Sequence, residues 1–169
     1  MGVNVNKVQF LNDLKDEQAQ WEALLDDIGE AHMTQPGAAG EWSIKDIVAH
    51  LTGWRHRTVG RLQAALHHQP QPPPPWPPAL QEDDEINAWI YESNRDRPLS
   101  DVLQESRSVF QQLLETFNAF PEAGLLDLLK HFGSTEENVP TGAAFFIHFH
   151  EGHEPDMRAW LDKISQEGS

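Results

Sequence analysis

The sequence predicts an all-α protein that folds as a four-helix bundle with one long proline-rich crossover. Apolar residues recur at intervals of three and four in four long stretches, at about residues 6–28, 43–66, 100–120 and 141–165. Almost no stretch alternates apolar and polar residues as a half-buried strand would. The crossover is expected at residues 69–79. Helices packed on helices, in a single domain that spans residues 1–169, are therefore the predicted architecture.

The first two long helices carry clear signals at their ends. Asn6 can cap the first helix, and Gly29 follows it as a stop. The second helix begins at Ser43, and Asp46 stands three residues later. This Ser-x-x-Asp arrangement predicts a capping box, in which each side chain bonds to the backbone N–H of the other residue.

The segment that follows the second helix must be extended. Seven prolines surround Trp76 between residues 69 and 78, and proline neither donates a backbone N–H nor fits a helix interior. The segment is either a linker or a lid that places Trp76 over the mouth of a pocket. Further along, we expect a short helix at residues 82–94, a short apolar segment at residues 125–132 and a loop at residues 133–142.

The inward stripe of the final helix contains two histidines. Its members, spaced four and three residues apart, are Phe146, His150, His153, Met157, Trp160 and Ile164. Pro155 interrupts this helix and is expected to bend it beside the histidines. His148 is expected to point outward, because it stands only two residues from His150.

The composition excludes several classes of protein. The chain has 12 Lys and Arg against 27 Asp and Glu, and the resulting net charge of −15 opposes binding to nucleic acid and to anionic membranes. No apolar run is long enough to span a membrane, and residues 1–7 lack the features of a signal peptide, so we expect a cytoplasmic protein. The absence of cysteine excludes disulfides, thiolate nucleophiles and zinc–thiolate sites.

His50, His150 and His153 are the candidate metal ligands. His50 lies on the apolar stripe of the second helix, between Ile47 and Trp54. A single inward histidine is usually a hydrogen-bonded core residue, whereas two helices that aim imidazoles at one interior are typical of a metal or acid–base site. Nitrogen ligands without cysteine favour zinc or nickel. Three protein ligands would leave one coordination position open.

Two glutamates are the candidate catalytic residues. Glu154 and Glu151 flank His153 in the sequence, where either could accept a proton or orient a ligand. If the site holds no metal, His50 and His153 could themselves act as an acid–base pair in an apolar pocket.

Three motifs resemble one protein family. Residues 42–54 read Trp-Ser-x-Lys-Asp-x-x-x-His-Leu-x-x-Trp, residues 98–103 read Pro-Leu-Ser-Asp-Val-Leu, and residues 153–161 read His-Glu-Pro-Asp-Met-Arg-Ala-Trp-Leu. With the helix order and lengths, these motifs resemble the DinB/YfiT-like superfamily, and more narrowly its ClbS/DfsB branch. The resemblance covers almost the whole chain and implies a four-helix bundle that is often a homodimer.

The resemblance also implies a metal site made of three histidines. One ligand of the family comes from the second helix and matches His50. Two come from the last helix, usually four residues apart, and here they fall on Phe149 and His153. Phe149 departs from the family pattern because its side chain cannot bind a metal. His150 is the candidate replacement, since residues three apart on a helix are neighbours.

Three functions are consistent with these observations. The first is a metal-dependent hydrolase or transferase that acts on a small electrophilic molecule. The second, implied by the ClbS resemblance, is a metal-free protein that inactivates or sequesters a reactive metabolite. The third is a helical bundle with no enzymatic activity, whose interior histidines are structural. The first two require a small-molecule ligand, and none of the three requires nucleic acid or a membrane.

Overall fold

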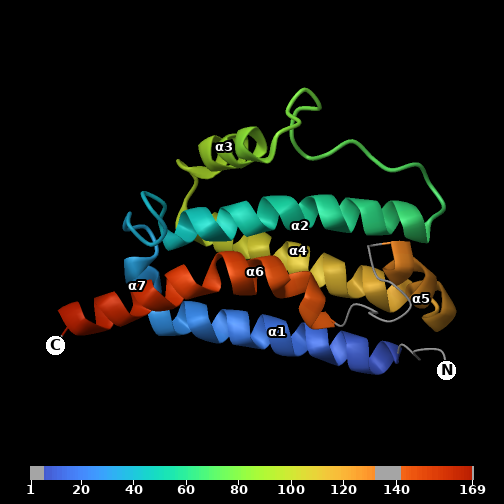
Figure 1. Cartoon of the computed structure of the whole chain (residues 1–169), viewed down its shortest axis with the longest axis horizontal. Coiled ribbons are helices and arrows are strands. Elements are labelled where there is room, and N and C mark those ends of the chain that lie inside the picture. Colours follow the sequence, from blue (N-terminus) through green and yellow to red (C-terminus); the bar gives the residue numbers. More distant parts are fainter. Residues whose placement is uncertain (1–5, 132–141, 169) are drawn as a thin grey trace.

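A computed structural model describes residues 6–131 and 142–168, and in these residues it has helices but no strands (Figure 1). The α-helices are α1 (Lys7–Ile28), α2 (Ile44–Leu66), α3 (Asp83–Asn94), α4 (Leu99–Ala119), α5 (Glu122–His131), α6 (Ile147–Gly152) and α7 (Glu154–Glu167). Two 3₁₀ helices, η1 (Glu30–His32) and η2 (Gly142–Phe146), complete the set. The all-α prediction is confirmed. The predicted loop at residues 133–142 lies outside the described residues except for Gly142.

Helices α1, α2, α4 and the pair α6–α7 are the long members of the bundle (Figure 1). The start of α1 lies beside the end of α4, because Lys7 Nζ donates to the backbone oxygens of Asn118 (2.5 Å) and Phe120 (2.8 Å). The start of α2 lies near the start of α4, because Lys45 Nζ donates to the Arg95 oxygen (2.8 Å). Helix α1 therefore runs opposite to α4, and α2 runs in the same direction as α4. No helix in the described part of the chain has the length and apolar character needed to cross a membrane.

The predicted helix ends are confirmed for α1 and α2. The Asn6 side chain accepts from the Gln9 N–H at 3.2 Å, and Gly29 follows α1 with a φ of 82° that favours glycine. The capping box of α2 is complete: Ser43 Oγ accepts from the Asp46 N–H at 3.2 Å, and Asp46 Oδ2 accepts from the Ser43 N–H at 2.9 Å. This box fixes where α2 begins and therefore which of its residues face the core.

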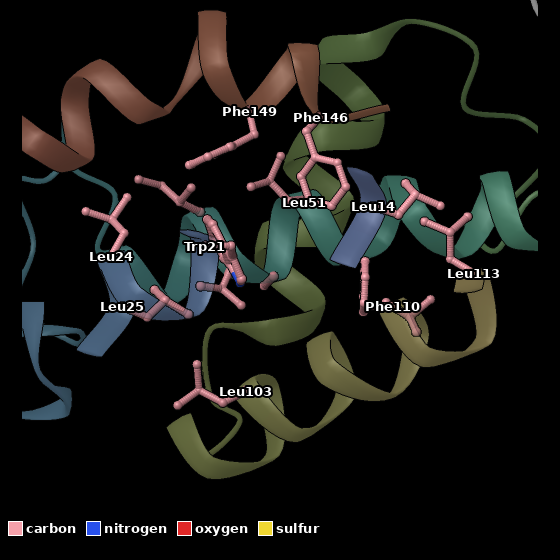
Figure 2. Packing of buried hydrophobic residues seen from close by; sticks show 14 of the residues in the cluster. Leu14, Trp21, Leu24, Leu25, Leu51, Leu103, Phe110, Leu113, Phe146 and Phe149 are labelled. Atoms are coloured by element: carbon pink, nitrogen blue, oxygen red, sulfur yellow. The ribbon is translucent and has the colours of Figure 1, made fainter. Parts of the chain in front are cut away.

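The core lies between the long helices, and aromatic residues of the last helical segments fill its centre. Phe146 and Phe149 project from these segments into the layer that contains Leu14, Trp21 and Leu51 (Figure 2). The rings of Phe149 and Trp21 meet edge to face, with centroids 5.0 Å apart. Edge-to-face aromatic pairs add roughly 0.5–1.5 kcal/mol beyond the burial of their surface.

The last helical region is broken, which corrects the prediction of one continuous helix over residues 141–165. The break is at His153, whose φ of −131° and ψ of −35° leave the helical range between α6 and α7. Pro155 stands in the first turn of α7. Proline is tolerated there because backbone N–H groups of the first turn have no acceptor within the helix, so the N–H that proline lacks breaks no hydrogen bond. The chain before α6 is also wound as a 3₁₀ helix, so the helical repeat does not continue unchanged through this region.

Helix α3 and the proline-rich segment form a second, smaller cluster on α2. Trp76 is buried there with Ile86 and Ile90, and its ring meets that of Trp54 with centroids 4.9 Å apart. Helix α3 approaches α2 closely at Gly53, where an added Cβ would lie 2.8 Å from Ile90 Cδ1. This packing holds α3 over the first half of α2.

Gly142 is expected to be the glycine that least tolerates a side chain. A Cβ at this position would lie 2.8 Å from the Leu14 nitrogen and the Phe10 oxygen, which belong to the backbone of α1 and cannot turn away. Gly142→Ala should lower the free energy of unfolding by roughly 1–3 kcal/mol, as overpacking does. Gly60→Ala is the control, because the nearest atom to its added Cβ is Pro72 Cγ at 3.5 Å. Equal stability of the two variants in urea unfolding would contradict this account.

Candidate metal centre

Three imidazoles converge where α2 meets the junction of α6 and α7. His50 comes from α2, His148 from α6 and His153 from the junction itself. His50 Nε2 lies 3.3 Å from His148 Nε2, and His153 Nε2 lies 3.2 Å from the same atom. Each ring offers one nitrogen, and all three nitrogens lie within 4.8 Å of one another. We call these three residues the histidine cluster.

The burial of Phe149 explains why His148 joins the cluster. Successive residues of an α-helix are about 100° apart around its axis. Because Phe149 points into the core, the residues on either side of it point to opposite flanks of α6. His148 points to the flank that faces α2 and meets His50, and His150 points to the flank that faces α1.

The structure corrects the expected third member of the cluster, which was His150. The His150 ring lies between two carboxylates, with Nδ1 2.5 Å from Glu154 Oε2 and Nε2 2.6 Å from Glu17 Oε2. Burial favours the neutral ring, but the hydrogen bonds to Glu154 and Glu17 outweigh it and raise the pKa of His150. Both of its nitrogens are therefore engaged away from His50. His148, which was expected to point outward, takes its place.

The environment keeps His50 neutral. Burial, and then the proximity of His153 and His148, lowers the pKa of His50 from 6.5 to about 4. Burial and the neighbouring His148 also lower the pKa of His153, although Asp156 acts in the opposite direction. A neutral imidazole keeps a lone pair on one ring nitrogen, which is the form that binds a metal.

Aromatic packing, together with the contact of Nε2 to His148, orients the His50 ring. Its Nδ1 atom is buried with no hydrogen-bond partner in the structure. The Trp42 ring covers His50 with a centroid separation of 5.4 Å, and Trp42 in turn stacks on Tyr91. The ring therefore presents Nε2 to the other two histidines.

Two of the three separations between the nitrogens match those around a small divalent ion, and the third is within 4.8 Å. Tetrahedral zinc with Zn–N distances of about 2.0–2.1 Å requires its nitrogen ligands to lie roughly 3.3–3.4 Å apart. The two shorter separations in the cluster are 3.3 and 3.2 Å. Hydrogen bonds alone cannot pair all three nitrogens well. His148 Nε2 faces two other nitrogens, but it carries either one proton or one lone pair, so it can form a good hydrogen bond with only one of them. A cation at the centre would engage all three lone pairs at once.

A cleft of about 370 Å³ opens beside the cluster. Most of its surface is apolar, although half of its lining residues are polar. The lining residues are His50, Leu51, Trp54, Arg55, Thr58, Asp83, Asn87, Leu113, Phe145, Phe146, His148 and Phe149. Two members of the cluster thus also face the cleft. The volume suits a small organic molecule. Trp76 is not among the lining residues, since it is buried in the smaller hydrophobic cluster on α2.

The two candidate catalytic glutamates lie in different environments. Glu154 is half-buried, and it accepts from Arg158 Nε at 2.9 Å in addition to its contact with His150. Burial raises the pKa of Glu154, but the bonds from His150 and Arg158 lower it by more, so the carboxylate stays ionised. Glu151 is exposed.

The fold and the cluster together define a class: an all-α bundle with a histidine-based candidate metal centre at the edge of an apolar cleft. Of the three histidines, His50 is buried, His153 is half-buried and His148 is exposed. The sequence profile of the DinB superfamily matches residues 9–154, so the chain belongs to the DinB superfamily. Comparison with curated proteins and with solved structures gave no significant match.

The low pKa of His50 predicts a loss of stability in acid. The pKa of this group is about 4 in the folded protein and 6.5 in the reference state. Between these values the unfolded chain binds more protons, so stability falls as the pH is lowered from 6.5 towards 4. His50→Gln removes this titration. Between pH 7 and pH 5, the metal-free wild type should therefore lose up to roughly 2 kcal/mol more unfolding free energy than the variant. If urea unfolding showed the same pH dependence for the wild type and His50→Gln, the low pKa of His50 would be contradicted.

Proposed function

We propose that this protein is a metal-dependent hydrolase or transferase that acts on a small electrophilic molecule. The observation that carries the proposal is the convergence of three imidazole nitrogens, from His50, His148 and His153, at the edge of an apolar cleft. Zinc and nickel are the favoured ions, since the ligands are nitrogens and the chain has no cysteine.

Each part of this site would have a distinct task. The three histidines would hold the ion, which when bound supplies a Lewis acid with an open coordination position. The apolar walls, including Leu51 and Phe146, would bind the carbon skeleton of the substrate and exclude water from it. The low local polarity would strengthen the electrostatic interactions made inside the cleft.

A role for Glu154 or Glu151 in proton transfer is a further part of the proposal. Glu154 is the stronger candidate because it directly follows His153 and is ionised and half-buried. Its bonds to His150 and Arg158 fix its side chain beside the junction of α6 and α7, and its backbone directly follows the candidate ligand His153. Glu151, which is exposed, is the weaker candidate.

A metal-free protein that inactivates or sequesters a reactive metabolite, as in the ClbS/DfsB branch, is the second candidate. The aromatic lining of the cleft favours it, because Trp54, Phe145 and Phe146 can enclose an apolar molecule without a metal. Membership of this branch is an inference from the motifs at residues 42–54, 98–103 and 153–161. A homodimer and a cytoplasmic location are also inferences from the sequence.

The proline-rich residues 69–79 are proposed to serve as the crossover that makes the site possible. Such a connection lets α4 begin beside the start of α2, where Lys45 Nζ bonds to the Arg95 oxygen. In the same segment, Pro72 approaches Gly60 of α2.

Metal content and activity in matched histidine variants test the proposal. Wild type, His148→Ala and His150→Ala are purified without an affinity tag and analysed by mass spectrometry for zinc and nickel. Each is then incubated with a panel of epoxides, alkyl halides and nitrophenyl esters, with either water or a thiol as acceptor. We expect about one ion per chain and consumption of an electrophile in the wild type and in His150→Ala, and neither in His148→Ala.

Two outcomes would contradict parts of this proposal. Equal metal content in His148→Ala and the wild type would contradict the assignment of the ligands. Consumption of an electrophile that persists in His148→Ala and after treatment with a chelator would establish the metal-free function instead.

A further inference from the structure

Arg55 is a charged side chain in the cleft with no charged partner. It lies on α2 and lines the same cleft as His50 and His148. Its guanidinium carbon lies 5.0 Å from the centroid of the Phe146 ring, a cation–π contact. The described residues give this guanidinium no hydrogen bond and no ion pair. Its pKa falls to about 10 through burial alone, so Arg55 is still charged at neutral pH.

Among the described residues, Arg55 resembles Arg57, which also contacts an aromatic ring and has no carboxylate partner, but only Arg55 lines the cleft beside the histidine cluster. Asp and Glu outnumber Lys and Arg by 27 to 12, so carboxylates are not scarce. Other arginines of the structure do have carboxylate partners, as Arg107 has Glu22 (3.1 Å) and Arg158 has Glu154 (2.9 Å). A half-buried charge without a partner costs free energy unless a ligand completes its hydrogen bonds. The guanidinium group carries five N–H donors, and here they have no acceptor.

Arg55 and two histidines of the cluster line one cleft, so a single small ligand can contact both. Arg55 follows His50 by five residues on the same helix, which corresponds to roughly 7–8 Å along the helix axis. Leu51 and Trp54, which stand between His50 and Arg55 in the sequence of α2, also line the cleft. A molecule that lies along these two residues would place one end at the guanidinium and the other at the imidazoles.

We propose that Arg55 binds a carboxylate group of the substrate, so that the electrophile on which this protein acts is an organic acid. The inference rests on the proposed function of the histidine cluster, and it names the chemical class of the substrate. A carboxylate matches the guanidinium because its two oxygens can accept two parallel N–H bonds.

The other polar groups of the cleft favour a single negative charge. Trp54 Nε1 already donates to Asn87 Oδ1 at 2.8 Å, and Thr58 Oγ1 donates to the Trp54 oxygen at 3.4 Å, so neither group is a free donor for an anion. Asp83 also lines the cleft and would repel a dianion such as a phosphate monoester. Because the repulsion by Asp83 grows with the charge of the ligand, the cleft favours a monoanion bound at Arg55 over a dianion.

Binding of matched acid and amide probes tests the proposal. The probes are benzoate, 3-phenylpropanoate and 5-phenylpentanoate, each paired with its neutral amide, and dissociation constants are measured by isothermal titration calorimetry on the full chain. We expect at least one acid to bind the wild type about tenfold more tightly than its amide. Arg55→Met should abolish this preference, and Arg55→Lys should retain part of it. Arg107→Met, which removes a paired surface arginine, should leave it unchanged.

The same titrations on His148→Ala separate this inference from the proposed function. A preference for the acid that persists in His148→Ala but is lost in Arg55→Met supports Arg55 even if the metal function fails. A preference that is lost in His148→Ala but persists in Arg55→Met shows that the carboxylate binds at the histidine cluster and overturns the proposal. Absence of binding by all three acids, or equal affinity for acids and amides, overturns it as well. Circular dichroism and thermal unfolding verify that each variant is folded.

Discussion

The packing of Phe149 against Trp21 is the interaction on which the candidate site depends. Helix α6 has only six residues, Ile147–Gly152, and Phe149 is its buried residue. The contact with Trp21 of α1 therefore fixes the rotation of the helix about its axis. The same rotation turns His148 towards α2 and His150 towards α1. One aromatic contact thus decides which imidazole enters the cleft.

This arrangement separates the histidines into two electrostatic environments. The cluster of His50, His148 and His153 contains no carboxylate, and burial lowers the pKa of two of its members. On the other flank of α6, two carboxylates hold His150 and raise its pKa. The first environment keeps lone pairs available for a cation, and the second ties the last helices to α1 through Glu17. In the same cleft, the guanidinium of Arg55 has no ion-pair partner among the described residues, so its positive charge is available to an anionic ligand.

The fold was predictable because its signals are local. The apolar repeats of α1, α2 and α4, the Asn6 cap and the Ser43–Asp46 capping box each act over a few residues, and the structure contains all of them. His50 and His153 were also expected on inward-facing stripes, and their ring centroids lie 4.9 Å apart. The third imidazole was not predictable in this way, because one regular helix through residues 141–165 would turn His150, and not His148, inward. The 3₁₀ turn before α6 and the break at His153 change the rotation of the intervening residues. Phe149 was the sequence signal for this rotation. The resemblance implies an inward position there, and an apolar residue at an inward position still points into the core, so His148 and His150 must flank it.

A crystal structure of protein soaked in zinc, with anomalous diffraction measured on both sides of the zinc absorption edge, tests the central claim most directly. The account predicts one strong anomalous peak bonded to the Nε2 atoms of His50, His148 and His153, at about 2.0–2.1 Å from each. His150 should remain between Glu17 and Glu154. A peak that includes His150 as a ligand, or an ordered histidine cluster without any peak, would contradict the account.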